Sequence, residues 1–363
     1  MRFVASEEYK RTMGNAENSA LPQMSHRAQI ANPFRAMVFG AMADEMIAAG
    51  ADVVKLSLGE PDFGAPPAVR DAMREQYDGR PLPYTAAMGL PELRQAISDF
   101  YKERHHVDVD PKRIAITAGG STALLLAAAL TVNEGDEVLI ADPSYPCNRE
   151  LVRAFGGKVV DVPTNAGTRF HLTPELCREY WSDRTKAVMI TSPSNPTGTT
   201  IAFDTLKSVC DLAKERGAWR IVDETYLDLA DREPDGSDVK SVLACDPDAI
   251  VCSSFSKFFG MTGWRLGGWS CLNARSKPWT ISPPTSSCAR IHPPSMRRSR
   301  ASLRKRWPCA RNAVRSCWSV VALWSTDWLR SVCRWRLSRM ARSMRISIFP
   351  APVSTRGRSA NVR

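Results

Sequence analysis

The sequence has little that would suggest a membrane, secreted or metal-binding protein. None of its apolar runs approaches the ~20 residues that cross a bilayer, and residues 1–14 mix acids with bases without the apolar core of a signal peptide. No two of the ten cysteines form a Cys-x-x-Cys pair, and the five histidines show no ligand spacing. Because 44% of the 363 residues are hydrophobic, a buried core is expected. We therefore expect a cytoplasmic protein with no metal site, no disulfide framework and no membrane partner.

Acidic residues and glycine are almost absent from the C-terminal quarter of the chain. Residues 270–363 hold 18 Arg and 2 Lys against one acid, Asp327, and only one glycine, Gly357. Residues 1–269, by contrast, hold 29 basic and 37 acidic side chains, so the net charge of +11 divides into −8 and +19. The same tail has 17 Ser, 6 Trp, 5 Cys and no Tyr. Two different compositions are thus joined in one chain.

Two interpretations of residues 270–363 remain open. A basic segment dotted with aromatics is typical of a tail that binds nucleic acid. Such tails seldom contain this much Trp and Cys, and they usually contain Gly or Lys. GC-rich coding DNA translated in the wrong frame gives mainly Arg, Ser, Pro, Ala, Cys and Trp, which fits better. We therefore expect an aberrant tail and no nucleic-acid partner, and translation of the gene in all three frames tests this expectation.

The N-terminal third predicts helices connected by irregular segments. Residues 1–30 are mostly polar without clear periodicity, so we expect a disordered arm there. An apolar face predicts a helix at 36–49, and a short strand is expected at 53–58 before a loop rich in Gly and Pro. Further helices are expected at 66–78 and 91–104.

From residue 113 the pattern alternates between apolar strands and helices. Such alternation predicts an α/β fold with a mixed, mainly parallel sheet covered on both faces. Functional residues in such sheets gather at the carboxyl ends of the strands. The expected strands are 113–117, 136–142, 158–163, 187–193, 218–223 and 249–255, and the expected helices are 123–130, 144–155 and 203–217.

Two loops at strand ends could hold a flat anionic ligand. In TAGGSTALL, two glycines end a strand, and Gly120 and Ser121 lead into a helix, where free N–H groups and the helix dipole favour an anion. A tight turn without a ligand explains the same residues. In DPSYPCNRE, Tyr145 follows a strand and could cover a flat ring. The alternative is a half-buried loop tyrosine.

Two further loops place polar side chains at strand ends. SPSNPTG fixes an irregular loop that presents Asn195 inward, although a plain turn is the alternative. In IVDETY, Asp223 ends an apolar strand, where a carboxylate is costly unless it meets a cation. Tyr226 lies three residues further on, and a helix N-cap is the other role open to Asp223.

A lysine lies in the fifth loop, SSFSKFFGMTGWRLG. Small hydroxyl residues and Phe258 and Phe259 flank Lys257, and Arg265 follows eight residues later. An amine in apolar surroundings near another cation has a lowered pKa and can form a Schiff base. The alternative is a solvated surface lysine, against which the neighbouring aromatic residues argue.

These five loops, in this order, resemble the class I/II aminotransferases, which are fold type I enzymes that use pyridoxal 5′-phosphate. The resemblance runs from about Pro33 to Trp269 and includes LSLGEPDFGAPP and YTAAMGLPELRQAI. It implies a large cofactor-binding domain at 58–269 with a mainly parallel seven-stranded sheet. Residues 31–57 would begin a small α/β domain, which stays incomplete because 270–363 replaces the rest of it.

The resemblance also implies catalytic roles. Lys257 would hold the cofactor as an internal aldimine and then move the proton as general base and acid. Asp223 would pair with the protonated pyridine nitrogen. Asn195 and Tyr226 would hydrogen-bond the phenolic oxygen of the ring, and Tyr145 would stack on it. The phosphate would be held by Gly120, Ser121, Ser254, Arg265 and, from the neighbouring subunit of a homodimer, Tyr84.

The implied reaction moves an amino group between an amino acid and a 2-oxo acid by a ping-pong mechanism. Gly59 and Asn195 would lie against the substrate. The family's arginine for the substrate carboxylate cannot be matched to a position in this sequence, and the amino donor cannot be identified. Two alternatives remain: an inactive truncated or frameshifted product that at most binds the cofactor, and a lyase or synthase of the same fold.

Overall fold

The computed structural model describes residues 24–270, apart from 77, 80, 82, 234 and 235. The expected tail after Ser270 and most of the expected N-terminal arm lie outside the described residues. The helices are α2 (His26–Ile30), α3 (Arg35–Ala48), α4 (Pro67–Glu75), α5 (Pro91–His105), α6 (Gly120–Thr131), α7 (Pro146–Ala154), α8 (Pro174–Glu179) and α9 (Phe203–Glu215).

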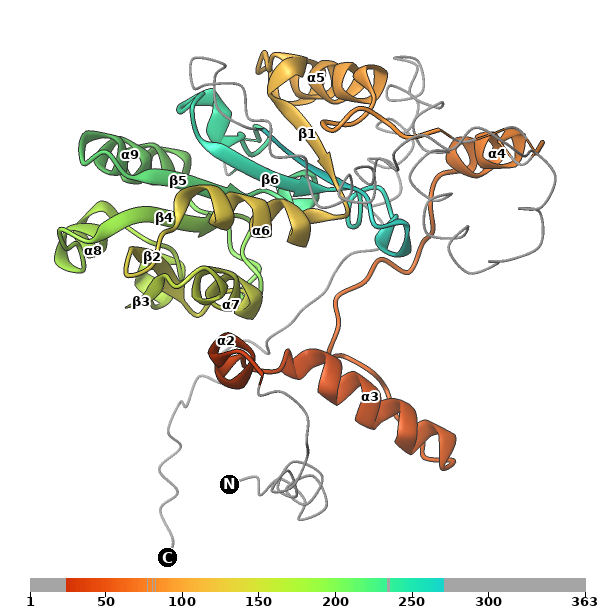
Figure 1. The fold of residues 1–363 in the computed structure, drawn as a ribbon, viewed down its shortest axis with the longest axis horizontal. Helices are drawn as coiled ribbons and strands as arrows, with labels where there is room; N and C mark the ends of the chain where they lie inside the picture. The colour runs from red at the N-terminus through yellow and green to blue at the C-terminus, as the bar shows by residue number, and fades with distance from the viewer. Residues whose placement is uncertain (1–23, 77, 80, 82, 234–235, 271–363) are drawn as a thin grey trace, which may run out of the picture.

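Seven strands form one sheet in the spatial order β1-β7-β6-β5-β4-β2-β3 (Figure 1). The strands from β6 to β3 run parallel to their neighbours, whereas β7 is antiparallel to both β1 and β6. The predicted α/β fold with a mainly parallel seven-stranded sheet is therefore confirmed. The strands are β1 (Ile114–Thr117), β2 (Glu137–Asp142), β3 (Lys158–Pro163), β4 (Thr185–Thr191), β5 (Trp219–Asp223), β6 (Ile250–Ser254) and β7 (Gly267–Ser270).

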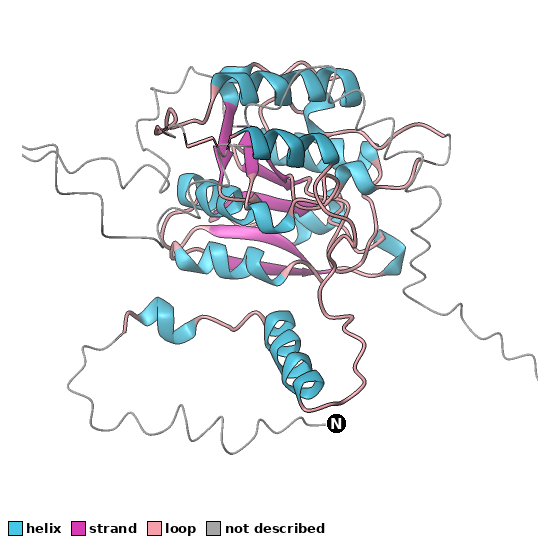
Figure 2. Ribbon diagram, turned by 90° about the vertical axis from the view of Figure 1, so that its right-hand side faces the viewer, coloured by secondary structure: helices cyan, strands magenta, loops and turns pink. Residues whose placement is uncertain are grey.

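Helices cover both faces of the sheet, as the apolar strands require (Figure 2). Side chains alternate along each strand. In β4, Ala187 and Met189 therefore pack with residues of α6 and α7, whereas Val188 and Ile190 pack with residues of α9 on the other face. The parallel order also places the carboxyl ends of β4, β5 and β6 side by side.

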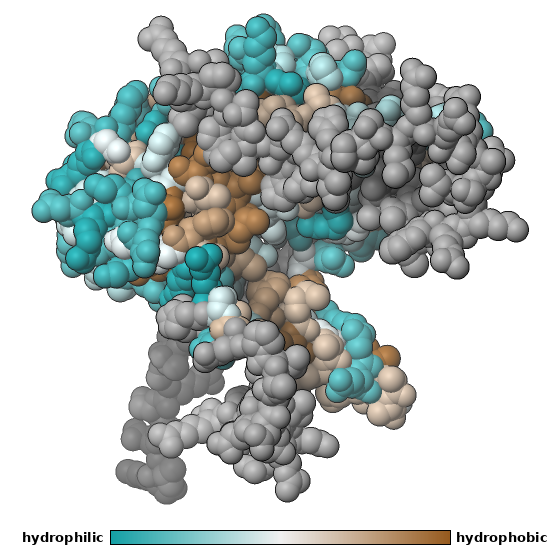
Figure 3. All heavy atoms as spheres, viewed as in Figure 1, coloured by the Kyte–Doolittle hydropathy of each residue, from teal (hydrophilic) through white to brown (hydrophobic). Residues whose placement is uncertain are grey.

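Helices α2 and α3 lie apart from the sheet in both ribbon views (Figures 1 and 2). Only Gly40 of α3 is buried, and Met37, Phe39 and Met42 are more than half exposed. In Figure 3 the surface of this helix shows brown and tan areas beside teal ones. The apolar face expected for residues 36–49 is present, but within the described part of the chain it packs against little.

Several local predictions differ from the structure. Helix α2 lies at the end of the arm that was expected to be disordered. The strand expected at 53–58 is irregular, because no described strand pairs with it. The helix expected at 66–78 ends at Glu75. Strand β7 has the sequence GGWS, which lacks the apolar alternation of a strand, and it was not predicted. Among the described residues, no helix is both long and apolar enough to cross a membrane.

Candidate active site

The candidate site lies where β4, β5 and β6 end and α6 begins. The sheet register pairs Thr191 with Asp223 and Asp223 with Cys252, so three adjacent strands end at the same edge. The loops that follow these strands carry the predicted residues Asn195, Tyr226 and Lys257. The topology thus gathers side chains that are 62 residues apart in sequence.

Asp223 is a buried carboxylate that lacks a cationic partner. Only 6% of the residue is exposed, and its Oδ1 accepts a hydrogen bond of 3.0 Å from the backbone N–H of Thr225. Burial raises the pKa of Asp223, although the hydrogen bonds from Thr225 oppose this shift. Among the described residues, no Lys, Arg or His side chain lies within ion-pair distance of it. The site is therefore suited to a ligand that brings a positive N–H group.

Lys257 points its amine toward the Gly59 carbonyl and the Tyr226 ring. Its Nζ donates a hydrogen bond of 2.6 Å to the carbonyl oxygen of Gly59 and lies 5.6 Å from the centroid of the Tyr226 ring. Burial lowers the pKa of Lys257; the charge of Glu60 opposes this effect, and that of Arg265 adds to it. The amine is thus more readily deprotonated than an ordinary lysine, as a nucleophile requires.

Two tyrosines complete the same part of the site. Tyr226 shares a side-chain hydrogen bond with Asn195, while burial and the charge of Asp223 raise its pKa. Tyr145 is half-buried at the start of α7, and its pKa is raised by burial, by its hydrogen bond with Cys147, and by the nearby charges of Tyr226 and Asp223. The Phe34 ring meets Tyr145 edge-on, with 5.8 Å between the ring centroids.

The start of α6 and Arg265 form a cradle of N–H donors, the α6 cradle, whose chemistry suits an anion. The first N–H groups of a helix have no acceptor within it, and Gly120 and Ser121 occupy these positions in α6. Gly119 has φ of +89°, and a Cβ built on it would lie 2.5 Å from Nη2 of Arg265. A Cβ on Gly120 would lie 3.3 Å from the Cβ of Ser254. The positive φ of Gly119 favours glycine there, and a Cβ on Gly120 would require Ser254 to shift by a few tenths of an ångström.

One predicted residue lies away from these groups. Tyr84 is 73% exposed, and no hydrogen bond or ring contact joins it to the site residues within the part of the chain that the structure describes. The structure thus brings together Gly59, Tyr145, Asn195, Asp223, Tyr226 and Lys257, and beside them Gly120, Ser121, Ser254 and Arg265. Their roles remain predictions.

Two residues that face the site were missed in the sequence. The backbone N–H of Thr225 donates to Asp223. The sequence could have indicated this contact, because an Asp side chain often accepts a hydrogen bond from the N–H two residues further on. The charge of Glu60, which lies 197 residues before Lys257, opposes the lowering of the Lys257 pKa. Nothing in the sequence around Glu60 indicated this interaction.

The residues fit pyridoxal phosphate in chemical type. Asp223 offers a carboxylate to a pyridinium nitrogen, and Lys257 offers an amine to an aldehyde. The backbone N–H groups at the start of α6 and the guanidinium of Arg265 can both bind a phosphate. No group of three or more His, Cys, Asp and Glu residues within 24–270 is arranged to hold a metal ion. A mainly parallel sheet with such groups at its strand ends is typical of α/β enzymes, in which ligands bind at this edge.

Comparison with known proteins identifies the family. The profile of the family described as "Aminotransferase class I and II" matches residues 51–290, which is more than half of the chain. This chain therefore belongs to the class I and II aminotransferases. The match continues beyond Trp269, where the resemblance seen in the sequence ends, into residues outside those that the structure describes.

Several relatives carry aminotransferase names. A valine–pyruvate aminotransferase of Mycobacterium tuberculosis is 37% identical over 235 residues, which cover 65% of this chain and 60% of the relative. An aspartate aminotransferase of Pyrococcus abyssi is 35% identical over 245 residues, covering 67% and 62%. The solved aspartate aminotransferase of Thermus thermophilus with maleate has a TM-score of 0.73 and 27% identity, covering 88% of this chain and 77% of that one. The chain spans about three fifths of the length of the curated relatives.

Proposed function

We propose that this protein is a pyridoxal-phosphate-dependent aminotransferase that moves an amino group between an amino acid and a 2-oxo acid. The observation that carries the proposal is the position of Lys257, whose amine lies between the Gly59 carbonyl and the Tyr226 ring. Burial lowers the pKa of this amine at an edge of the sheet that also holds a buried, unpaired carboxylate. The family membership and the names of the relatives support this function.

When bound, the cofactor supplies an aldehyde that takes up amino groups and a ring that accepts electrons. Asp223 would keep the pyridine nitrogen protonated, because a buried carboxylate is stabilised by a positive N–H donor. The paired side chains of Asn195 and Tyr226 would hold the phenolic oxygen. Tyr145 would cover one face of the ring, with Phe34 against its edge.

Lys257 would hold the cofactor, and its amine would serve as the general base and acid that takes and returns the proton at the substrate Cα. Its lowered pKa makes the neutral amine available as a base. Gly120, Ser121, Ser254 and Arg265 would bind the phosphate and keep the ring in register with Lys257. Because one site is used twice, by an amino acid and then by a 2-oxo acid, the kinetics would be ping-pong.

The proposal includes a cytoplasmic homodimer. Tyr84 is exposed in one chain, so its hydroxyl is free to reach the phosphate held by a neighbouring subunit. The substrate pair is left as an amino acid and a 2-oxo acid. The relatives' names include aspartate and valine with pyruvate, so these substrates are the first to test.

The two half-reactions provide the test. The full chain, loaded with cofactor and freed of excess, is mixed with aspartate or valine alone. We expect one equivalent of the matching 2-oxo acid per site and a change in cofactor absorption that a second 2-oxo acid reverses. The Lys257→Ala chain is the control and should give neither change. Absorption that never responds would show a cofactor binder without turnover, and release of ammonia or loss of the substrate side chain would show a lyase; either result contradicts the proposal.

A further inference from the structure

The residue next to Asp223 is a second buried carboxylate on the opposite face of the sheet. Glu224 is 3% exposed, and it follows Asp223 directly at the end of β5. Since consecutive residues of extended chain point to opposite faces, Asp223 faces the candidate site while Glu224 faces α5. Glu224 has no part in the proposed contacts with cofactor or substrate.

Three hydrogen bonds pin the Glu224 carboxylate to one turn. The hydroxyl of Ser241 donates to its two oxygens at 2.9 and 3.1 Å, and the backbone N–H of Val242 donates to Oε1 at 2.7 Å. Ser241 is fully buried and caps the short helix at Val242–Ala244. The carboxylate therefore links the end of β5 to an element that lies 17 residues further on.

The backbone around this point is held as well. The N–H of Glu224 donates to the carbonyl of Cys252 at 2.8 Å, and the N–H of Ser192 donates to the carbonyl of Asp223 at 3.1 Å. The neighbouring strands thus fix the backbone from both sides within the plane of the sheet. The Glu224 side chain adds hydrogen bonds perpendicular to that plane, a direction in which the strands provide none.

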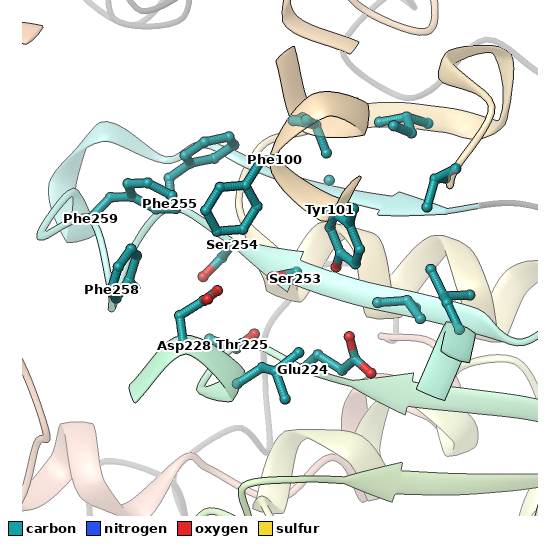
Figure 4. Close-up of a pocket in the computed structure, with 17 residues that line it drawn as sticks. Phe100, Tyr101, Glu224, Thr225, Asp228, Ser253, Ser254, Phe255, Phe258 and Phe259 are labelled. Carbon is teal, nitrogen blue, oxygen red and sulfur yellow. The ribbon is translucent and has the colours of Figure 1, made fainter. Parts of the chain in front are cut away.

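The surroundings of Glu224 are otherwise unfavourable to a charge. It lines a cavity of about 60 Å³ between α5 and the sheet, whose wall includes Phe100, Tyr101 and Phe255. Figure 4 shows Glu224 on the sheet side of this cavity and Tyr101 on the helix side. Burial raises the pKa of Glu224 to about 7, against the hydrogen bonds and the charge of His105. Burying a carboxyl group in these surroundings destabilises the fold unless its hydrogen bonds compensate for the water it has lost.

We propose that Glu224 is a positioning residue for the cofactor: by pinning the end of β5 to the turn at Ser241 and Val242, it holds the Asp223 carboxylate against the pyridine nitrogen. The proposal rests on the proposed function. Its basis is the juxtaposition of two buried carboxyl groups at adjacent positions, one facing the cofactor site and one tied behind it. Small displacements of a supporting residue are enough to loosen a ligand-binding group.

The test uses four full-length chains: wild type, Glu224→Ala, Glu224→Gln and Asp246→Asn. Glu224→Ala removes all three hydrogen bonds, whereas Glu224→Gln keeps an acceptor for Val242 and a partner for Ser241. Asp246→Asn is the matched control. Asp246 is as deeply buried as Glu224. It forms a two-point ion pair with Arg220, a residue of β5 that lies away from the carboxyl end of that strand. Cofactor affinity and the visible absorption of the bound cofactor are measured, together with thermal unfolding.

We expect Glu224→Ala to weaken cofactor binding by about 10- to 100-fold, the range found when supporting partners of metal ligands are removed. The absorption spectrum should also shift, because the ring nitrogen loses its partner. Glu224→Gln should restore both properties to near wild type. Asp246→Asn should lower the unfolding temperature while leaving the spectrum unchanged.

Other outcomes separate the two proposals. A wild-type chain that binds cofactor normally, with a Glu224→Ala variant of the same spectrum and affinity, overturns this inference alone. A wild-type chain that takes up no cofactor overturns the proposed function and this inference together. If Glu224→Ala does not fold, Ser241→Ala, which removes two of the three hydrogen bonds, takes its place and should shift the spectrum in the same direction.

Discussion

At the residue scale, the reactivity of Lys257 depends on burial and on two charges of opposite sign. Burial removes water from the ammonium form and lowers its pKa below the ordinary 10.5. Glu60 stabilises the ammonium and Arg265 destabilises it. The pH at which this amine becomes a nucleophile can therefore be moved in either direction by changing a neighbour.

Glu60→Gln should lower the pKa of Lys257, because it removes the charge that favours the ammonium. Arg265→Gln should raise it. The measurement is reductive methylation of the cofactor-free chain across pH, followed by mass spectrometry of the Lys257 peptide. Lys207 serves as an internal reference, since Asp211 raises its pKa. Equal midpoints for Lys257 and Lys207 in the wild-type chain would rule out the environment described for Lys257.

Asp223→Ala should reduce turnover more than Tyr145→Phe. The alanine variant loses a charge-assisted hydrogen bond at the reacting centre, which should raise the barrier by about 3 kcal/mol or more, over a hundredfold in rate. The phenylalanine variant keeps the ring that stacks on the cofactor. Steady-state rates of both variants, measured with saturating cofactor, give the comparison. Similar rates would remove Asp223 from the proposed mechanism.

Most residues of the candidate site could be found in the sequence because each ends a buried strand or follows one closely. Asp223 is a carboxylate at the end of an apolar run, and Lys257 lies in a run of aromatic and small residues; both patterns are unusual without a function. Glu60 and Phe34 could not be found this way. They meet Lys257 and Tyr145 only through the tertiary fold, and their own segments carry no such signal.

At the element scale, the close approach of β7 to the turn before α6 shapes the α6 cradle. A Cβ on Gly267 would lie 2.5 Å from the carbonyl carbon of Gly119 and 2.6 Å from the backbone nitrogen of Gly120. Both neighbours are backbone atoms, which cannot move aside as a side chain can. The backbone of β7 therefore packs directly against the backbone at the start of α6.

Gly267→Ala should separate β7 from α6 and destabilise the fold by about 1–3 kcal/mol, the usual cost of overpacking. The same substitution at Gly263, where a Cβ would meet no atom within 4 Å, is the control. Thermal unfolding followed by circular dichroism compares the two variants. If the Gly263 variant is destabilised as much as the Gly267 variant, the close approach is not the cause.

The alternating pattern from residue 113 predicted the central parallel strands correctly because they are apolar on both faces, as the two-sided burial of β4 shows. It failed at β7, whose glycines pack backbone against backbone and leave no hydrophobic signal. Local apolar character also failed as a predictor at 53–58, where a segment that resembles a strand has no described neighbour to pair with. Pairing partners, rather than local propensity, decide such segments.

At the scale of the whole molecule, the described chain leaves apolar surface on α3 and on the segment after it. Val54 and Leu56 are 78% and 89% exposed, and Met37 and Phe39 lie on the exposed side of α3. Surfaces of this kind are normally covered in the functional assembly. The proposed homodimer also requires Tyr84 to act in the neighbouring subunit.

The full chain should therefore have twice the 40.2 kDa mass of one subunit in solution. Size-exclusion chromatography with light scattering measures this mass. Mixing Lys257→Ala with Tyr84→Ala chains then tests the shared site, since each mixed dimer should regain one site with both wild-type residues. A monomer, or no recovery of cofactor affinity on mixing, would contradict the shared arrangement.

The central claim is that Lys257 is the residue that carries the cofactor, and one measurement tests it directly. The full chain is incubated with pyridoxal phosphate, reduced with borohydride, digested and mapped by mass spectrometry. The account predicts a single pyridoxyl group on the peptide that contains Lys257, and its loss in the Lys257→Ala chain. A folded protein labelled on another lysine, or not labelled at all, would show that the site at the ends of β4, β5 and β6 does not have the function proposed for it.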